Sequence, residues 1–116
     1  MNHRKAFSTL AAAVLLALAA PAAQAWDGIV TGRVTMTEIT HGDNMGYRVY
    51  LGGTAMCTTG HSWAFLQASE SNYKVYVAEI MLAKARNTPV TIFSYIDGGT
   101  GRYCHIGHLV AHTHPQ

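Results

Sequence analysis

The sequence has few charged residues and no local grouping of charge. Only 12% of its 116 residues are Asp, Glu, Lys or Arg, and two of the eight basic residues lie within the first five positions. The remaining six basic residues balance six acidic ones. Because nucleic-acid binding needs a basic cluster that neutralises phosphates, this even distribution gives no support to a nucleic-acid partner.

The sequence also lacks the local motifs of common hydrolases. Its acidic residues occur singly, so spacing sets up no carboxylate pair for acid–base chemistry, and no G-x-S-x-G motif is present. Cys104 and His105 are adjacent, but neighbours on a strand point to opposite faces, which makes His105 a poor base for Cys104. We therefore expect a protein that is not an enzyme and that carries no cofactor.

No apolar run reaches the length of a membrane-spanning helix. Residues 1–25 combine a basic start, an apolar run of about ten residues and the small-residue sequence Ala-Gln-Ala before Trp26. This pattern is typical of a secretory signal peptide. It predicts an exported protein, either secreted or periplasmic, without a membrane span, whose mature part is a single domain over residues 26–116.

Cysteine is scarce, with only Cys57 and Cys104 in the chain. In an exported protein an even pair favours a disulfide over a metal site or a catalytic thiol. Closing a loop of about 48 residues would stabilise the fold by roughly 4 kcal/mol on the chain-entropy model.

The mature sequence is mainly β with one helix. Strands are predicted for five stretches that are rich in β-branched or aromatic residues and bounded by turn signals: 29–40, 47–51, 63–68, 90–96 and 102–112. A helix is predicted from about residue 72 to Arg86, ahead of Pro89. This order of three strands, one helix and two strands is that of a small OB-fold-like barrel. Because the helix is apolar on two sides, we expect it to pack on its own sheet and on a partner chain, as in a homo-oligomer.

The C-terminal stretch CHIGHLVAHTH, residues 104–114, contains four histidines. Gly107 and the preceding DGGTG turn favour a strand over a helix here. Strand geometry predicts that His108, His112 and His114 share one face with Cys104, while His105 faces the opposite way. Only His112 and His114 lie close enough to bind one ion, so a metal site is at most a weak histidine-tail site.

Several strings resemble the B subunits of AB5 toxins of the subtilase cytotoxin and typhoid toxin type. The family opens with D-G-x-Y-S-G-x-V, and residues 27–34 read DGIVTGRV. An alanine-rich helix, a turn and Pro-Val precede a strand in the family, as in AEIMLAKARNTPVTIFSYI, residues 78–96. The family also has a cysteine ahead of a tryptophan, as in Cys57 and Trp63. The similarity extends over most of the mature chain.

This resemblance implies a pentameric OB-fold that binds cell-surface glycans on its outer face and partners an enzymatic A subunit. The glycan-contacting serine of the family corresponds to Thr31, and the tyrosine before it to Val30. The family's acidic contact falls near Leu51, and its helix-end tyrosine near Lys84 or Ala85. Because that pocket is mostly not reproduced, a different glycan is expected, with Asp27 and Thr31 as the candidate contacts.

Two alternatives remain open at this point. The protein can be a stand-alone periplasmic or secreted protein of structural or inhibitory role, with the same barrel and no glycan site. It can also be a weak metal binder that uses His112 and His114.

Overall fold

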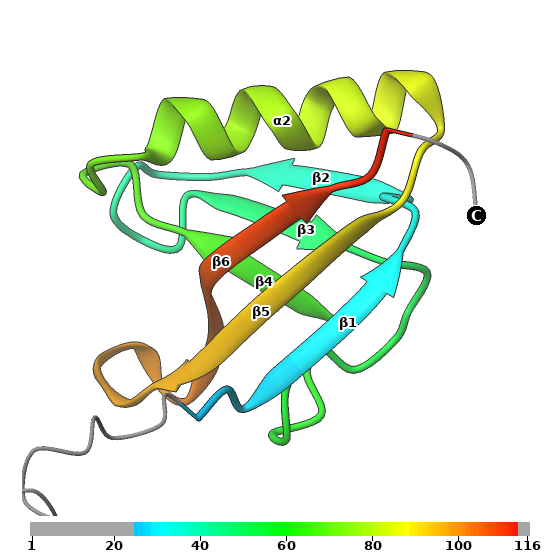
Figure 1. The fold of residues 1–116 in the computed structure, drawn as a ribbon. Helices are drawn as coiled ribbons and strands as arrows, with labels where there is room; N and C mark the ends of the chain where they lie inside the picture. Colours follow the sequence, from blue (N-terminus) through cyan, green and yellow to red (C-terminus); the bar gives the residue numbers. More distant parts are fainter. Residues whose placement is uncertain (1–24, 114–116) are drawn as a thin grey trace, which may run out of the picture.

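A computed structural model describes residues 25–113 (Figure 1). The predicted signal peptide and His114 fall outside the described residues, apart from Ala25 at the end of the signal. Within residues 25–113, no helix has the length and apolar character that crossing a bilayer requires.

The structure is mainly β, with six strands and one long helix. The elements are β1 (Gly28–Gly32), β2 (Met36–Ile39), β3 (Tyr47–Tyr50), β4 (Trp63–Leu66), α2 (Tyr73–Arg86), β5 (Val90–Asp97), the 3-10 turn η1 (Gly98–Thr100) and β6 (Tyr103–Ala111). The predicted helix and the last four predicted strands are confirmed with small shifts of their ends. The predicted first strand, 29–40, is instead two strands, because the chain bends between Gly32 and Met36.

The strands form one sheet in the order β1-β5-β6-β4-β3-β2. All neighbours pair antiparallel except β4 and β6, which are parallel. The two edge strands, β1 and β2, follow each other in the sequence, and only residues 33–35 separate them. No described ladder joins β1 to β2, so the sheet is not closed, and an OB-type barrel remains a prediction.

Helix α2 runs across one end of the curved sheet, next to β2 and the end of β6 (Figure 1). Its inner side buries Ile80 and Ala83 in the core, and its last residues are followed by Asn87 in the left-handed conformation, which ends the helix. Its outer side leaves Val75, Met81 and Leu82 exposed by 63%, 57% and 43%. The helix is thus apolar on two sides, as the sequence indicates. Its inner side packs on this chain, and its outer side is exposed.

The predicted disulfide is confirmed. Cys57 and Cys104 are bonded, with their Cα atoms 5.8 Å apart. The bond joins β6 to the loop before β4, and both cysteines are buried in the core cluster. The same loop is held by Ser94, whose buried hydroxyl donates to the Met56 carbonyl at 2.8 Å.

Strand β6 contains a bulge at Gly107 that changes which face its later residues occupy. In the ladder with β5, Phe93 pairs with His108 and Ser94 with Ile106, so Gly107 has no partner residue. One extra residue inverts the alternation of a strand. Cys104 and Ile106 point into the core before the bulge, and Leu109 and Ala111 pack against it afterwards.

The expected placement of the histidines was therefore wrong. His108 and His112 do not share a face with Cys104, and His105 does not oppose them. His105, His108 and His112 all lie on the outer face of the sheet, because the bulge lies between the first and the other two. Strict two-residue alternation breaks at this single inserted residue.

Candidate functional site

A cleft lies between the start of α2 and the bulge of β6. It has a volume of about 360 Å³. We call it the α2–β6 cleft, and it is lined by Trp26, Glu70, Ser71, Asn72, Tyr76, Tyr95, Ile106 and Gly107. These residues come from the chain before β1, the start of α2, β5 and β6, so only the folded chain brings them together.

Gly107 lets two aromatic rings approach the backbone of β6 closely, and a third aromatic residue bonds to that backbone through its hydroxyl. A Cβ atom built there would lie 2.5 Å from Cζ3 of Trp26 and 3.2 Å from Cδ1 of Tyr95. The Tyr76 hydroxyl donates to the Gly107 carbonyl at 3.2 Å. The bulge thus exposes a backbone group that Tyr76 engages, and the missing side chain leaves space for the rings.

Trp26 is held on the outer face of the sheet by two ring contacts. Its ring meets Phe93 edge-on at 5.6 Å and His108 at 6.4 Å between centroids. Asp27, the next residue, is fixed to β5, because its backbone N–H donates to Ser94 and its carboxylate accepts from the Ile96 N–H. The wall formed by Trp26 is therefore anchored before the first strand begins.

A buried histidine supports the opposite wall. His105 is only 7% exposed and stacks on Phe65 at 4.5 Å between ring centroids. Its Nε2 contacts a carboxylate oxygen of Glu70, and its Nδ1 lies 3.0 Å from Oδ2 of Asp97.

The same Nδ1 atom lies 2.8 Å from the hydroxyl of Tyr95. The other carboxylate oxygen of Glu70 accepts from the Gln67 N–H, so Glu70 also closes the turn before α2. Burial raises the pKa of the Tyr95 hydroxyl, as do the nearby carboxylates of Asp97 and Glu70. His105 therefore positions two lining residues, Glu70 and Tyr95, from behind the cleft.

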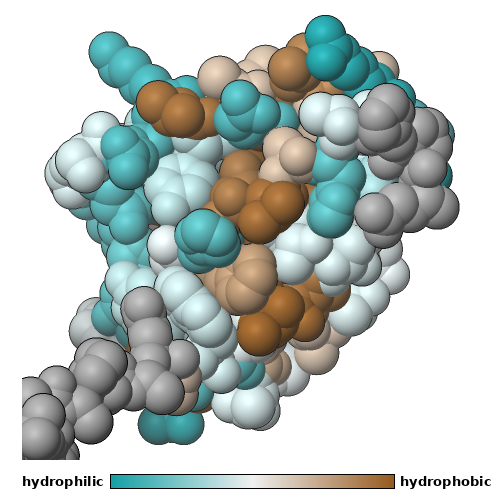
Figure 2. All heavy atoms as spheres, viewed as in Figure 1, coloured by the Kyte–Doolittle hydropathy of each residue, from teal (hydrophilic) through white to brown (hydrophobic). Residues whose placement is uncertain are grey.

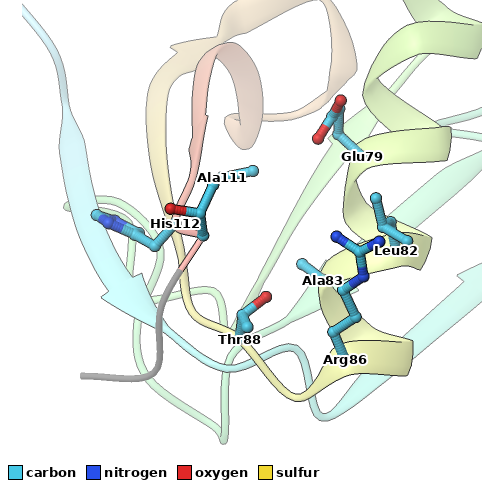
Figure 3. Close-up of a pocket in the computed structure, with 8 residues that line it drawn as sticks. Glu79, Leu82, Ala83, Arg86, Thr88, Ala111 and His112 are labelled. Atoms are coloured by element: carbon cyan, nitrogen blue, oxygen red, sulfur yellow. The ribbon is translucent and has the colours of Figure 1, made fainter.

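Two further hollows continue the cleft along the seam between α2 and β6. The first, of about 270 Å³, shares Asn72 and Tyr76 with the cleft and extends to Glu79 and His108. The second, of about 80 Å³, starts at Glu79 and ends at Arg86 and His112 (Figure 3). In Figure 3 the His112 ring points away from α2, and its Nε2 lies 2.8 Å from the Thr91 hydroxyl.

The two residues expected to contact a glycan are not brought together. Asp27 lies just before β1 and Thr31 near its other end, about 13 Å apart by strand rise. The Asp27 carboxylate is occupied by the Ile96 N–H, and the Thr31 hydroxyl lies 2.6 Å from that of Thr91. Through Thr91, Thr31 and His112 belong to one hydrogen-bonded chain, which the sequence did not indicate.

A second aromatic group lies elsewhere on the outer face. Trp63 of β4 stacks on Tyr103 of β6 at 4.7 Å, and the Arg48 guanidinium of β3 lies 4.6 Å from its ring centroid. Because β4 lies between β3 and β6, these neighbours contact Trp63 from two sides. His61 also contacts the Tyr103 ring, at 4.5 Å. The rings of this stack cover one another, whereas those of the α2–β6 cleft surround an open volume.

The described part of the chain contains no group of three or more His, Cys, Asp or Glu arranged to hold a metal ion. Since His114 falls outside that part, the histidine-tail hypothesis stays a prediction.

Trp26, Tyr76 and Tyr95 belonged to the aromatic residues visible in the sequence, but no spacing singled them out. The one signal for their position was Gly107, a glycine within a predicted strand.

Comparisons with known proteins found no relative of this chain. No protein-family model matches the chain, and no curated protein or solved structure matches it.

Proposed function

We propose that this protein is an exported, non-enzymatic binding subunit that holds a carbohydrate in the α2–β6 cleft. One observation carries the proposal: at the side-chain-free bulge at Gly107, the Trp26 and Tyr95 rings approach the backbone and the Tyr76 hydroxyl bonds to it, and all three residues line one cleft. Ligand sites are concave and combine aromatic walls with a few placed polar groups. The exposed side chains of Ser71 and Asn72 supply such groups at the rim.

The cleft fits a sugar better than it fits a wholly apolar molecule. A sugar ring has an apolar face that packs on aromatic rings, and hydroxyls that bond to amide and hydroxyl groups. Asn72 is the N-cap residue just before α2 but makes no side-chain capping bond, so its amide is available for a ligand. The first adjoining hollow extends the cleft to His108 and the second continues to His112, which gives room for more than one sugar unit.

A carbohydrate remains the expected ligand, but we place it in the α2–β6 cleft instead of at Asp27 and Thr31. Asp27 contributes by fixing Trp26, while Thr31 lies about 13 Å along β1. An OB-type barrel is supported by the two edge strands, β1 and β2, which follow each other in the chain. In a partly open barrel, one bent segment of this kind pairs with strands at both ends of the sheet.

Binding to the cleft is tested with labelled protein on a glycan array, followed by titration of the strongest sugar. Asn72→Ala should lower the affinity for that sugar by about tenfold, as expected for a lost hydrogen-bonding side chain. Asn44→Ala is the matched control, because Asn44 is exposed in the loop before β3. A Trp63→Phe background leaves Trp26 as the only tryptophan and makes fluorescence quenching specific to the cleft. Absence of any sugar ligand, or equal affinities of both Asn variants, contradicts the proposal.

We further propose that the subunit self-associates through the outer side of α2. The exposed side chains of Val75 and Leu82 lie one above the other on that side, at a spacing of two helical turns. Native mass spectrometry should show an oligomer for the wild type and a smaller species for Val75→Glu with Leu82→Glu. A monomeric wild-type protein at micromolar concentration would refute self-association and leave the cleft untouched.

A further inference from the structure

The lining of the α2–β6 cleft is negatively charged. Among the described residues that line the cleft, Glu70 is the only one with a formal charge, and none is Lys or Arg. The hollow that adjoins the cleft at Asn72 and Tyr76 adds Glu79, again without Lys or Arg. His108 lines that hollow and is the one residue of either lining that can gain a positive charge by protonation. Uncharged acceptors suffice to hold a neutral sugar, so a charged lining points to more than hydroxyl recognition.

The buried His105 does not cancel this negative charge. Its Nε2 contacts the carboxylate of Glu70, and its Nδ1 lies 3.0 Å from Oδ2 of Asp97. A protonated imidazole carries one positive charge, whereas the two carboxylates carry two negative charges. The three groups are therefore net negative whether or not the histidine is protonated. The N-terminus of α2 contributes a positive partial charge of about half a unit, which is too small to reverse the sign.

Glu70 acts on the hydroxyl groups of the cleft and is itself part of the cleft surface. Burial raises the pKa of the Tyr76 hydroxyl, and the carboxylate of Glu70 raises it further. About a quarter of the Glu70 side chain, 27%, is exposed. One of its oxygens contacts His105 and the other accepts from the Gln67 N–H. Because a carboxylate oxygen can accept more than one hydrogen bond, both oxygens remain able to bind a donor.

The aromatic residues of the cleft are the second feature that favours a cation. Trp26, Tyr76 and Tyr95 all line the cleft. The face of an aromatic ring attracts cations, and tryptophan does so most strongly. Aromatic walls are also the means by which proteins recognise organic ammonium groups. A sulfated or carboxylated sugar would instead bring a second negative charge next to Glu70.

We propose that the carbohydrate held in the α2–β6 cleft is an amino sugar, bound through its ammonium group. The ammonium group lies against the aromatic walls and pairs with the carboxylate of Glu70, while ring hydroxyls bond to the amide of Asn72. A second sugar unit in the adjoining hollow brings its ammonium group toward Glu79. This inference rests on the proposal that the cleft holds a sugar, and it adds the charge of that sugar.

A matched set of disaccharides tests the charge while the sugar backbone is kept constant. Cellobiose, diacetylchitobiose and fully deacetylated chitobiose share one linkage and carry a hydroxyl, an acetamide or an ammonium group at the same ring position. The full mature protein in the Trp63→Phe background is titrated with each and followed by Trp26 emission. At about pH 7, below the usual pKa of an amine, the amino groups are mostly charged. We expect deacetylated chitobiose to bind about tenfold more tightly than either neutral disaccharide.

Glu70→Gln removes the negative charge of Glu70 with little change in shape. It should reduce the preference for deacetylated chitobiose over cellobiose to within about twofold, because the paired charge is lost. Glu38→Gln is the matched control, because Glu38 of β2 lines neither the cleft nor the adjoining hollow. That variant should keep the wild-type preference.

Salt provides a test that needs no substitution at Glu70. Raising the ionic strength from about 0.1 M to about 1 M shortens the screening length from about 10 Å to about 3 Å. The preference of the protein for deacetylated chitobiose should then fall from about tenfold to about threefold, because the cleft is open to solvent. Cellobiose is uncharged, so its affinity serves as the reference at each salt concentration.

Several results would overturn the amino-sugar inference and leave the carbohydrate function in place. One is equal affinity for the three disaccharides, or tightest binding of diacetylchitobiose. Another is a preference that salt does not diminish. A preference that Glu70→Gln leaves intact, even at weaker overall affinity, would show that Glu70 only supports the wall. Absence of binding by all three, with a different sugar bound on the glycan array, would also refute the inference alone. Absence of any sugar ligand would refute the carbohydrate proposal as well.

Discussion

Replacing Gly107 by alanine tests the geometry on which the α2–β6 cleft depends. The added Cβ would lie 2.5 Å from Cζ3 and 2.9 Å from Cη2 of Trp26. Carbon atoms in contact prefer about 3.5–4.0 Å, so the indole must retreat by about 1 Å or more. The backbone at Gly107 does not have a positive φ angle, so alanine adds a steric cost without backbone strain.

The magnitude follows from how freely the indole can move. Overpacking costs about 1–3 kcal/mol in a closed core. Trp26 is half-buried at a cleft wall and can shift outward, so we expect the free energy of unfolding to fall by about 1–2 kcal/mol. The effect on ligand affinity should exceed tenfold, because the displaced ring leaves its place beside Phe93 and His108.

Urea unfolding followed by circular dichroism measures the first effect, and Trp26 emission in a Trp63→Phe background reports the displacement of the ring. Gly98→Ala is the control, because a Cβ at Gly98 meets no atom within 4 Å and that residue has no positive φ. If Gly107→Ala leaves both the emission and the unfolding free energy unchanged within about 0.5 kcal/mol, the rings do not converge as described.

Two further predictions address the frame of the site. Changing Cys57 and Cys104 to alanine together should lower the free energy of unfolding by roughly 4 kcal/mol, from a closed loop of about 48 residues, as measured by urea unfolding. A loss below about 1 kcal/mol would show that the bond adds little constraint. Asp27→Ala should cost about 1–2 kcal/mol, because the partly buried Ile96 N–H loses its acceptor. If Asp27→Ala instead abolishes sugar binding without lowering the free energy of unfolding, Asp27 contacts the ligand directly.

The outer face of the sheet is the part of the molecule where the sequence and the structure differ most. Figure 2 shows apolar side chains on the face that includes β1, β5 and β6. Ile29 of β1 and Val110 of β6 are exposed apolar residues. Alternation along 102–112 assigns His108 to the core side. The bulge at Gly107 reverses that assignment. The sequence of one strand does not show which of its residues will have no partner on the neighbouring strand.

The single long strand predicted over 29–40 fails for a similar reason. Its composition favours β structure throughout, and both halves are indeed strands. Whether they form one strand or two depends on pairing with β5 at one end and β3 at the other. Those partners lie toward opposite ends of the sheet, each next to an edge strand, which the sequence of 29–40 cannot specify by itself.

The sequence by itself determined the elements that depend on local chemistry. The apolar run ending ahead of Pro89 gave helix α2, alternation and turn residues gave most strands, and two cysteines in an export context gave the disulfide. Tertiary structure alone decided the sites, because the lining of each one comes from segments distant in the chain. Trp26, Tyr76 and Gly107 meet only when β6 bulges beneath α2, and Tyr47 and Tyr73 meet only when β3 and α2 pack together. Such convergence is a property of packing, which the periodicity of a single segment does not contain.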